Sequence, residues 1–178
     1  MEFVEDKIFY HIQRRVNYHS KAFWLPGETL FIGNEKNPFM KAFDLYGPVT
    51  DDLINSLGHY QRLIREFIFE EIRKEFFSNL PSRQKCLWVI PNNIDIINYW
   101  WKQIYSDERV LLKVSLTGKI HQVNQRYLKC NFESLDYNRE QAFRYWTGSS
   151  EFSNIENEIL FEGHIRIVEV LNSPEELY

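Results

Sequence analysis

The sequence is poor in cysteine, which argues against a structural metal site. Only Cys86 and Cys130 occur among 178 residues, and they form no CxxC pair. A zinc site built on thiolates is therefore not expected, and we interpret both cysteines as reduced thiols of the core. His19, His121 and His164 show no metal-ligand spacing with one another or with the cysteines, so we assign no metal.

Long apolar runs and glycine-rich motifs are also missing. No segment offers the run of about 20 apolar residues that a membrane-spanning helix needs. Residues 1–6 are acidic and lack the positive and apolar regions of a signal peptide, so we expect a cytoplasmic protein without a membrane partner. No G-x-G-x-x-G motif follows a strand pattern, so a Rossmann dehydrogenase is unsupported. The net charge of −4 gives no general attraction to nucleic acid.

Aromatic residues, in contrast, are abundant and make up 16% of the chain. Aromatic side chains suit strands, large core contacts and surfaces on which flat ligands stack. A chain of 178 residues suits one domain that buries a substantial core, and the sequence shows no internal repeat and no linker. We therefore predict a single domain over residues 1–178.

The hydrophobic pattern predicts strands and helices in an uneven order. The predicted strands cover residues 7–15, 28–33, 86–90, 109–123 and 155–171, and the predicted helices begin near residues 50, 92 and 134. Gly118 is interpreted as a turn or bulge, and residues 34–49 as a long loop. Helices that are this few do not alternate regularly with strands. We therefore predict an α+β fold with about three helices and not a doubly wound α/β fold.

The longest predicted helix runs from about residue 50 to residue 77. Seven apolar residues recur at helical spacing and are expected to face the core: Leu53, Leu57, Tyr60, Ile64, Phe67, Ile68 and Ile72. The other face carries four acidic and four basic side chains, including Glu66 and Glu70. Because the charges on this face balance, we interpret it as solvated and not as a ridge that binds nucleic acid.

The C-terminal stretch of residues 155–171 is rich in β-branched and apolar residues and is predicted to be extended, with Gly163 as a bulge or tight bend. Two carboxylates, Glu156 and Glu158, precede its apolar run. In a strand, residues two apart point to the same face. Two like charges on one face are an unusual choice for a purely structural strand, so this stretch is either a solvated strand start or a candidate site.

Three positions, His11, Trp88 and Glu158, lie on separate predicted strands. In this the chain resembles the ADP-ribosyltransferase superfamily, in the branch of diphtheria toxin and the poly(ADP-ribose) polymerases, which carries a histidine, an aromatic residue and a glutamate on three strands. The strand with His11 resembles that branch's YH strand. Asn98-Tyr99 follows Trp88 by ten and eleven residues, a similar spacing. Glu156 with Glu158 resembles the two-glutamate arrangement of mono-transferases. Trp88 departs from the more usual tyrosine.

The resemblance covers roughly residues 7–171 and implies an ADP-ribosyltransferase-like fold, a split β-sandwich with mixed sheets. It implies NAD as the substrate, Glu158 as the catalytic carboxylate, and Glu156 as a group that orients the acceptor or acts as a general base. Loss of nicotinamide passes through an oxocarbenium-like transition state, which a carboxylate stabilises. The residues expected to bind NAD are His11, Trp88, Arg14, Arg15, Arg83 and Tyr99.

The function that the resemblance implies is mono-ADP-ribosylation of a macromolecule, either protein or nucleic acid. Small members of this kind are often toxins or defence effectors, so an antitoxin or regulatory partner is a further expectation. Two alternatives stay open. One is a non-enzymatic module on the same fold that binds a nucleotide or a partner. The other is an RNA 2′-phosphotransferase of the same superfamily, which needs several arginines converging on two phosphates.

Overall fold

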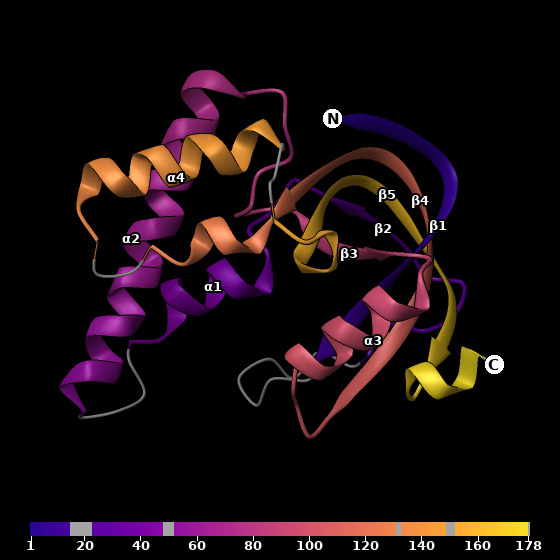
Figure 1. The fold of residues 1–178 in the computed structure, drawn as a ribbon. Helices are drawn as coiled ribbons and strands as arrows, with labels where there is room; N and C mark the ends of the chain where they lie inside the picture. Colours follow the sequence, from indigo (N-terminus) through magenta and orange to yellow (C-terminus); the bar gives the residue numbers. More distant parts are fainter. Residues whose placement is uncertain (15–22, 48–51, 131–132, 149–151, 178) are drawn as a thin grey trace.

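The computed structural model describes residues 1–14, 23–47, 52–130, 133–148 and 152–177, and within these ranges the protein has five strands and four α-helices (Figure 1). The strands are β1 (Glu2–Arg14), β2 (Thr29–Ile32), β3 (Leu87–Pro91), β4 (Arg109–Asn124) and β5 (Asn157–Leu171). The helices are α1 (Pro38–Leu45), α2 (Leu53–Phe76), α3 (Ile94–Gln103) and α4 (Leu135–Thr147). The predicted α+β class is confirmed, with one helix more than expected.

The strands form one sheet in the order β2-β5-β3-β1-β4, and β4 also pairs with β5. This additional pairing closes β1, β3, β5 and β4 into a ring. Every described pairing is antiparallel, so the expectation of mixed sheets is wrong. Parallel neighbours need long crossover connections, whereas antiparallel neighbours pair without one.

Two glycines allow β4 and β5 to cross closely inside this ring. Gly118 of β4 lies opposite Gly163 of β5. A Cβ atom on Gly163 would lie 2.5 Å from the carbonyl oxygen of Thr117 and 2.7 Å from the Cα atom of Gly118. Gly163 also has a φ of +145°, which L side chains rarely adopt. Gly118 is therefore not a turn between two strands, as the sequence allowed, but a contact point within one long strand.

The interior of the ring is an apolar cluster to which each of its four strands contributes. In β4, Val110, Leu112, Val114 and Leu116 belong to it, as their alternation predicted. Leu111, between them, is also fully buried, because α3 packs on the outer face of the ring at that point. A second outer cluster joins α2 and α4 to the sheet. The helices therefore pack outside the ring in two groups (Figure 1).

Three of the four helices begin at caps that the sequence indicated. The side chains of Asp52, Asn93 and Ser134 accept hydrogen bonds from main-chain N–H groups of the first turn. Helix α4 ends at Gly148 in the left-handed conformation, which glycine adopts readily. Helix α1 was not predicted, although Asn37 is a good cap residue and a proline follows it at the first helical position.

Helix α2 has the predicted limits, but its faces are not arranged as predicted. Ile68 and Ile72 are buried, whereas the apolar side chains of its first half are exposed. Conversely, Glu66 and Glu70 of the supposedly solvated face are buried. Helical periodicity identifies two faces, and it does not say which face meets the rest of the chain. No helix within the described residues is both long enough and apolar enough to cross a membrane.

Candidate functional site

The candidate site lies where the chain enters β5. Residues Asn154–Glu156 form a short 3₁₀ turn capped by Ser153, and β5 starts only at Asn157. Glu156 therefore does not belong to the strand, and the prediction that Glu156 and Glu158 share one strand face is wrong. The two carboxylates are held separately, Glu156 by Arg126 and Glu158 by Arg83.

Glu158 is bound through one of its two carboxylate oxygens. Its Oε1 accepts a hydrogen bond from the Tyr145 hydroxyl at 2.6 Å and another from Nη1 of Arg83. The side chain is 11% exposed. Within the described part of the chain, its Oε2 accepts no hydrogen bond. The carboxylate is thus oriented at one oxygen and left open at the other.

Arg83 is the centre of this cluster and is almost completely buried. Its Nε donates to Oε2 of Glu66 at 3.0 Å, and its Nη1 donates to both Tyr145 and Glu158. Burial alone lowers the pKa of Arg83, but Glu66, Tyr145 and Glu158 together raise it well above the ordinary value. Arg83 was expected to bind pyrophosphate. Its guanidinium is instead occupied by protein side chains, so in this conformation it positions Glu158.

Glu66 and Tyr145 are the members of the cluster that the sequence did not indicate. Burial raises the pKa of Glu66, but its ion pairs with Arg83 and Arg65 outweigh burial and lower it. Burial and the charge of Glu158 raise the pKa of Tyr145 well above its usual value, although Arg83 acts in the opposite direction. The Tyr145 hydroxyl therefore stays protonated and donates a hydrogen bond to Glu158. From the sequence, Tyr145 is interpreted as a packing residue of α4 and Glu66 as a solvated residue of α2. No local pattern distinguishes either residue from ordinary core or surface positions.

Trp88 lies on the same outer face of the ring as Glu158. It packs against the cluster formed by α2 and α4, and the guanidinium of Arg83 lies 5.5 Å from its ring centroid. Its Nε1 is buried and, within the described residues, has no hydrogen-bond partner. Arg83 therefore connects Trp88 with Glu158, so two of the three residues singled out in the sequence share one site.

His11 faces the other way. It follows Phe9 by two residues and therefore points to the same face of β1. Phe9 belongs to the interior cluster, and Trp24 packs against that cluster. The His11 ring lies 5.9 Å from the ring of Trp24, and its Nδ1 is 2.8 Å from the main-chain oxygen of Trp88. His11 thus holds β1 against β3, and its side chain does not share a face with Glu158. Of the three residues that carry the resemblance, His11 therefore lies apart from Trp88 and Glu158, because successive side chains of a strand alternate between its two faces.

His11, which is half-buried, and His121, which is buried, predict a loss of stability in mild acid. Burial lowers the pKa of His11 and of His121 from 6.5 to about 4. In the unfolded chain each histidine takes up a proton near pH 6.5, whereas in the folded chain it does so only near pH 4. We therefore expect each histidine to reduce the free energy of unfolding by roughly 2–3 kcal/mol between pH 6.5 and pH 4. Urea unfolding at several pH values measures this.

The matched comparison for that prediction uses His11→Gln and His164→Gln. His11→Gln removes one titrating group and is expected to reduce the pH dependence. The side chain of His164 is exposed on β5, so His164→Gln is expected to leave the pH dependence as in the wild type. Equal pH dependence in wild type and His11→Gln would contradict the prediction.

Glu156 and Tyr99 form a separate group beside α3. Oε2 of Glu156 accepts a hydrogen bond from Nε of Arg126, and the Tyr99 hydroxyl accepts one from Gln125 at 3.0 Å. Burial and the nearby charge of Glu156 raise the pKa of Tyr99. Tyr99 is therefore near Glu156.

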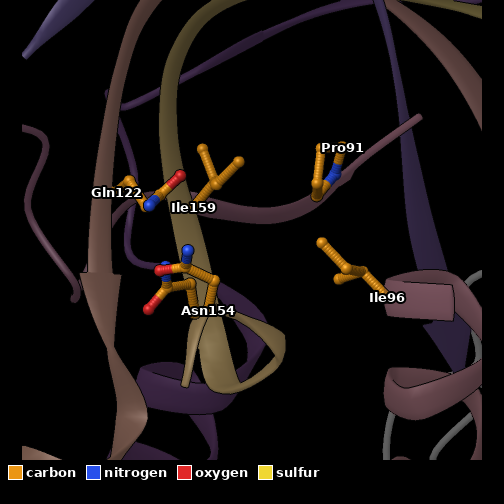
Figure 2. Close-up of a pocket in the computed structure, with 6 residues that line it drawn as sticks. Pro91, Ile96, Gln122, Asn154 and Ile159 are labelled. Atoms are coloured by element: carbon orange, nitrogen blue, oxygen red, sulfur yellow. The ribbon is translucent and has the colours of Figure 1, made fainter. Parts of the chain in front are cut away.

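A small cavity opens on the inner side of the same strand entry (Figure 2). It has a volume of about 140 Å³ and is lined by Pro91, Ile96, Gln122, Asn154, Asn157 and Ile159. Figure 2 shows Gln122, Asn154 and Ile159 on one side and Pro91 and Ile96 on the other. A cavity of about this size holds one six-membered ring. Its amide lining was not predicted, because the four segments meet only in the folded chain.

Two of the lining amides, Asn154 and Asn157, are bonded to each other, and Asn157 is also bonded to Asn124 beside the cavity. Nδ2 of Asn124 donates to Oδ1 of Asn157 at 2.8 Å, and Nδ2 of Asn157 donates to Oδ1 of Asn154 at 3.2 Å. A larger hollow of about 340 Å³ shares Gln122 and Ile159 with this cavity. Asn157 and Ile159 line the cavity while Glu158, between them, points to the outer face. The cavity and the carboxylate therefore lie on opposite sides of β5.

The remaining predicted residues are the two consecutive arginines. Arg14 is exposed at the end of β1, and Arg15 lies outside the described residues. Among the described residues, no group of three or more histidine, cysteine, aspartate or glutamate side chains could hold a metal ion.

Residues 45–173 match the model of a family described as "Protein of unknown function (DUF2441)". No curated protein matches the chain. The matched range contains Glu66, Arg83, Tyr145 and Glu158, whereas His11 lies before it.

Proposed function

We propose that this chain, which belongs to the DUF2441 family of proteins of unknown function, transfers ADP-ribose from NAD to a macromolecular acceptor. The proposal includes membership of the ADP-ribosyltransferase superfamily that the sequence resembles, with the single antiparallel sheet described above in place of mixed sheets. The observation that carries it is the state of Glu158, a carboxylate held at Oε1 by Arg83 and Tyr145 and open at Oε2.

A carboxylate held in this way suits the loss of nicotinamide. The bond between the ribose C1′ atom and the nicotinamide nitrogen breaks, and its electron pair leaves with neutral nicotinamide. Positive charge then develops on the ribose, and a fixed carboxylate oxygen stabilises it without reorganising. Arg83 and Tyr145 supply the fixed orientation, and the open Oε2 supplies the contact with the ribose.

Two further side chains support the proposal. The flat indole of Trp88, 5.5 Å from the Arg83 guanidinium, is suited to stacking on a nicotinamide ring. Glu156, two residues before Glu158 and 12% exposed in its side chain, would take the proton of the acceptor as it bonds to C1′. His11 and Arg83 are no longer assigned to NAD itself, because one faces the ring interior and the other is buried in ion pairs.

Replacing Glu158 with glutamine tests this proposal. The amide keeps the shape of the side chain and an acceptor for Tyr145 and Arg83, but it removes the charge. We expect the rate of nicotinamide release from NAD to fall by about 100-fold to 1,000-fold, the loss typical of one electrostatic group. Release is measured with purified protein by chromatography.

The matched control is Glu169→Gln, which removes a half-exposed carboxylate farther along the same strand. We expect this variant to release nicotinamide at the wild-type rate. The proposal fails if wild type and Glu158→Gln consume NAD equally, or if neither consumes it with protein and RNA acceptors present. A thermal melt of each variant separates loss of activity from loss of the fold.

The cavity on the other side of β5 favours a second candidate, a non-enzymatic module that binds a nucleotide ring. Its amides suit hydrogen bonding to a base or a carboxamide, and it does not face Glu158. In that case Asn154→Ala would weaken NAD binding in calorimetry, Glu158→Gln would not, and no nicotinamide would appear. An RNA 2′-phosphotransferase would release nicotinamide only when a 2′-phosphorylated RNA is added.

A further inference from the structure

The first half of α2 presents an apolar stripe that no described part of the chain covers. We call Leu53, Leu57, Tyr60, Ile64 and Phe67 the α2 seam. These five side chains are between 48% and 72% exposed, and the neighbouring Ile54 is 72% exposed. Figure 1 shows this half of α2 at the outer edge of the molecule. In an isolated chain such a stripe would face water.

The spacing of the seam is that of a helix that packs along another helix. Its members follow one another at intervals of four, three, four and three residues. Intervals that average 3.5 residues keep side chains on one line along the helix, and such a line fits between the side chains of a facing helix with the same repeat. A random exposed patch has no reason to keep this spacing.

The opposite face of α2 fixes the helix in place. Glu66 is ion-paired with Arg83, Phe69 is fully buried, and the indole of Trp146 donates a hydrogen bond to the main-chain oxygen of Phe69 at 2.7 Å. The seam therefore cannot turn inward without breaking the buried cluster. It has to be covered from outside or remain exposed.

We propose that a second copy of this chain covers the seam, with the two α2 helices antiparallel and Tyr60 near the two-fold axis. The seam and Ile54 are six large hydrophobic side chains, each of which is 48% or more exposed, and a contiguous exposed patch of this kind marks an interaction surface. A second copy brings a seam of the same length and the same repeat.

Charge also favours a second copy over a charged partner. None of the five seam positions is charged, so two identical seams meet without like charges facing each other. The charges within the seam's span are elsewhere: Arg62 bonds to the main-chain oxygen of Gly58, and Arg65 and Glu66 belong to the buried side. An antiparallel arrangement also places the positive end of one helix beside the negative end of the other.

The mass of the protein in solution tests this inference. We expect wild type to be a dimer in sedimentation and light scattering, and Ile64→Glu to raise the dissociation constant by at least about 100-fold, because it buries an unpaired charge at the interface. The matched control is Leu135→Glu, which changes a leucine that is 59% exposed on α4. This variant should remain a dimer. Circular dichroism melts show that both variants are folded.

A cross-link tests the identity and direction of the partner. Tyr60→Cys should form a disulfide-linked dimer on mild oxidation, because the two copies of residue 60 face each other, whereas Leu135→Cys should not. A monomeric wild type at high concentration overturns the inference, as does a dimer that survives Ile64→Glu. A wild type that stays monomeric and binds phosphatidylserine vesicles would assign the seam to a membrane surface instead.

Discussion

Replacing Arg83 with methionine is expected to lower the free energy of unfolding by about 3–5 kcal/mol, the cost of breaking a buried ion pair from one side. Arg83 is the cation that Glu66 and Glu158 share, and both carboxylates are nearly excluded from water. Methionine fills a similar volume but offers no donor. Arg65 remains beside Glu66, but Glu158 keeps only the Tyr145 hydroxyl.

The matched control is Arg144→Met, which removes the cation of an exposed pair with Glu140 on α4. Such exposed pairs contribute about 0.3–0.5 kcal/mol, so little change is expected. The pH dependence identifies the cause. Since uncompensated negative charge is what destabilises the Arg83→Met protein, its deficit relative to wild type should shrink as the pH falls from 7 towards 4 and the carboxylates take up protons. A deficit that is independent of pH would point to packing alone.

Replacing Gly163 with alanine is expected to cost about 3–5 kcal/mol or to prevent folding. The added Cβ would lie 2.5 Å from the oxygen of Thr117 and 2.7 Å from the Cα atom of Gly118, and both are main-chain atoms that cannot rotate away. The positive φ of residue 163 adds strain of about 1–3 kcal/mol. Soluble yield and urea unfolding measure the effect.

Gly58→Ala is the control for Gly163→Ala. Gly58 lies in α2, has no atom within 4 Å of an added Cβ, and has an ordinary φ. Alanine there should raise stability by about 0.5–1 kcal/mol, since glycine is costly inside a helix. If Gly163→Ala were as stable as wild type, the close crossing of β4 and β5 would not be required for the fold.

The parts of the fold that local chemistry determines could be predicted from the sequence. Asn93 and Ser134 cap helices because their side chains accept main-chain hydrogen bonds, and Gly148 ends α4 because it tolerates the left-handed conformation. Helix α1 was obscured because its proline resembles a loop signal. The closing of the ring depends on pairing between β4 and β5, which no local pattern encodes.

The candidate site was harder to predict because it depends on which face each residue takes. Trp88 and Glu158 were found together, but His11 was assigned to the wrong side, since a change of one position in strand register reverses a side chain. From the sequence, Arg83 is interpreted as an accessible loop residue that could bind a ligand. It became buried because Glu66 and Tyr145 come from two helices that are distant in sequence. The ion pairs of the cluster are long-range, so neither periodicity nor charge balance along α2 could reveal them.

The closed ring of strands has a consequence for how the protein behaves at high concentration. Open strand edges recruit strands from other molecules and lead to aggregation. β4 is paired along both edges from Leu111 to Ile120, which leaves no free template there. The first part of β1 pairs with β4 alone, but it is bulged between Val4 and Lys7 and carries several charged side chains. These features discourage edge-to-edge growth along β1 and β4, and β2, the end strand of the sheet, has only four residues. Self-association should therefore stop at a defined complex built through helices.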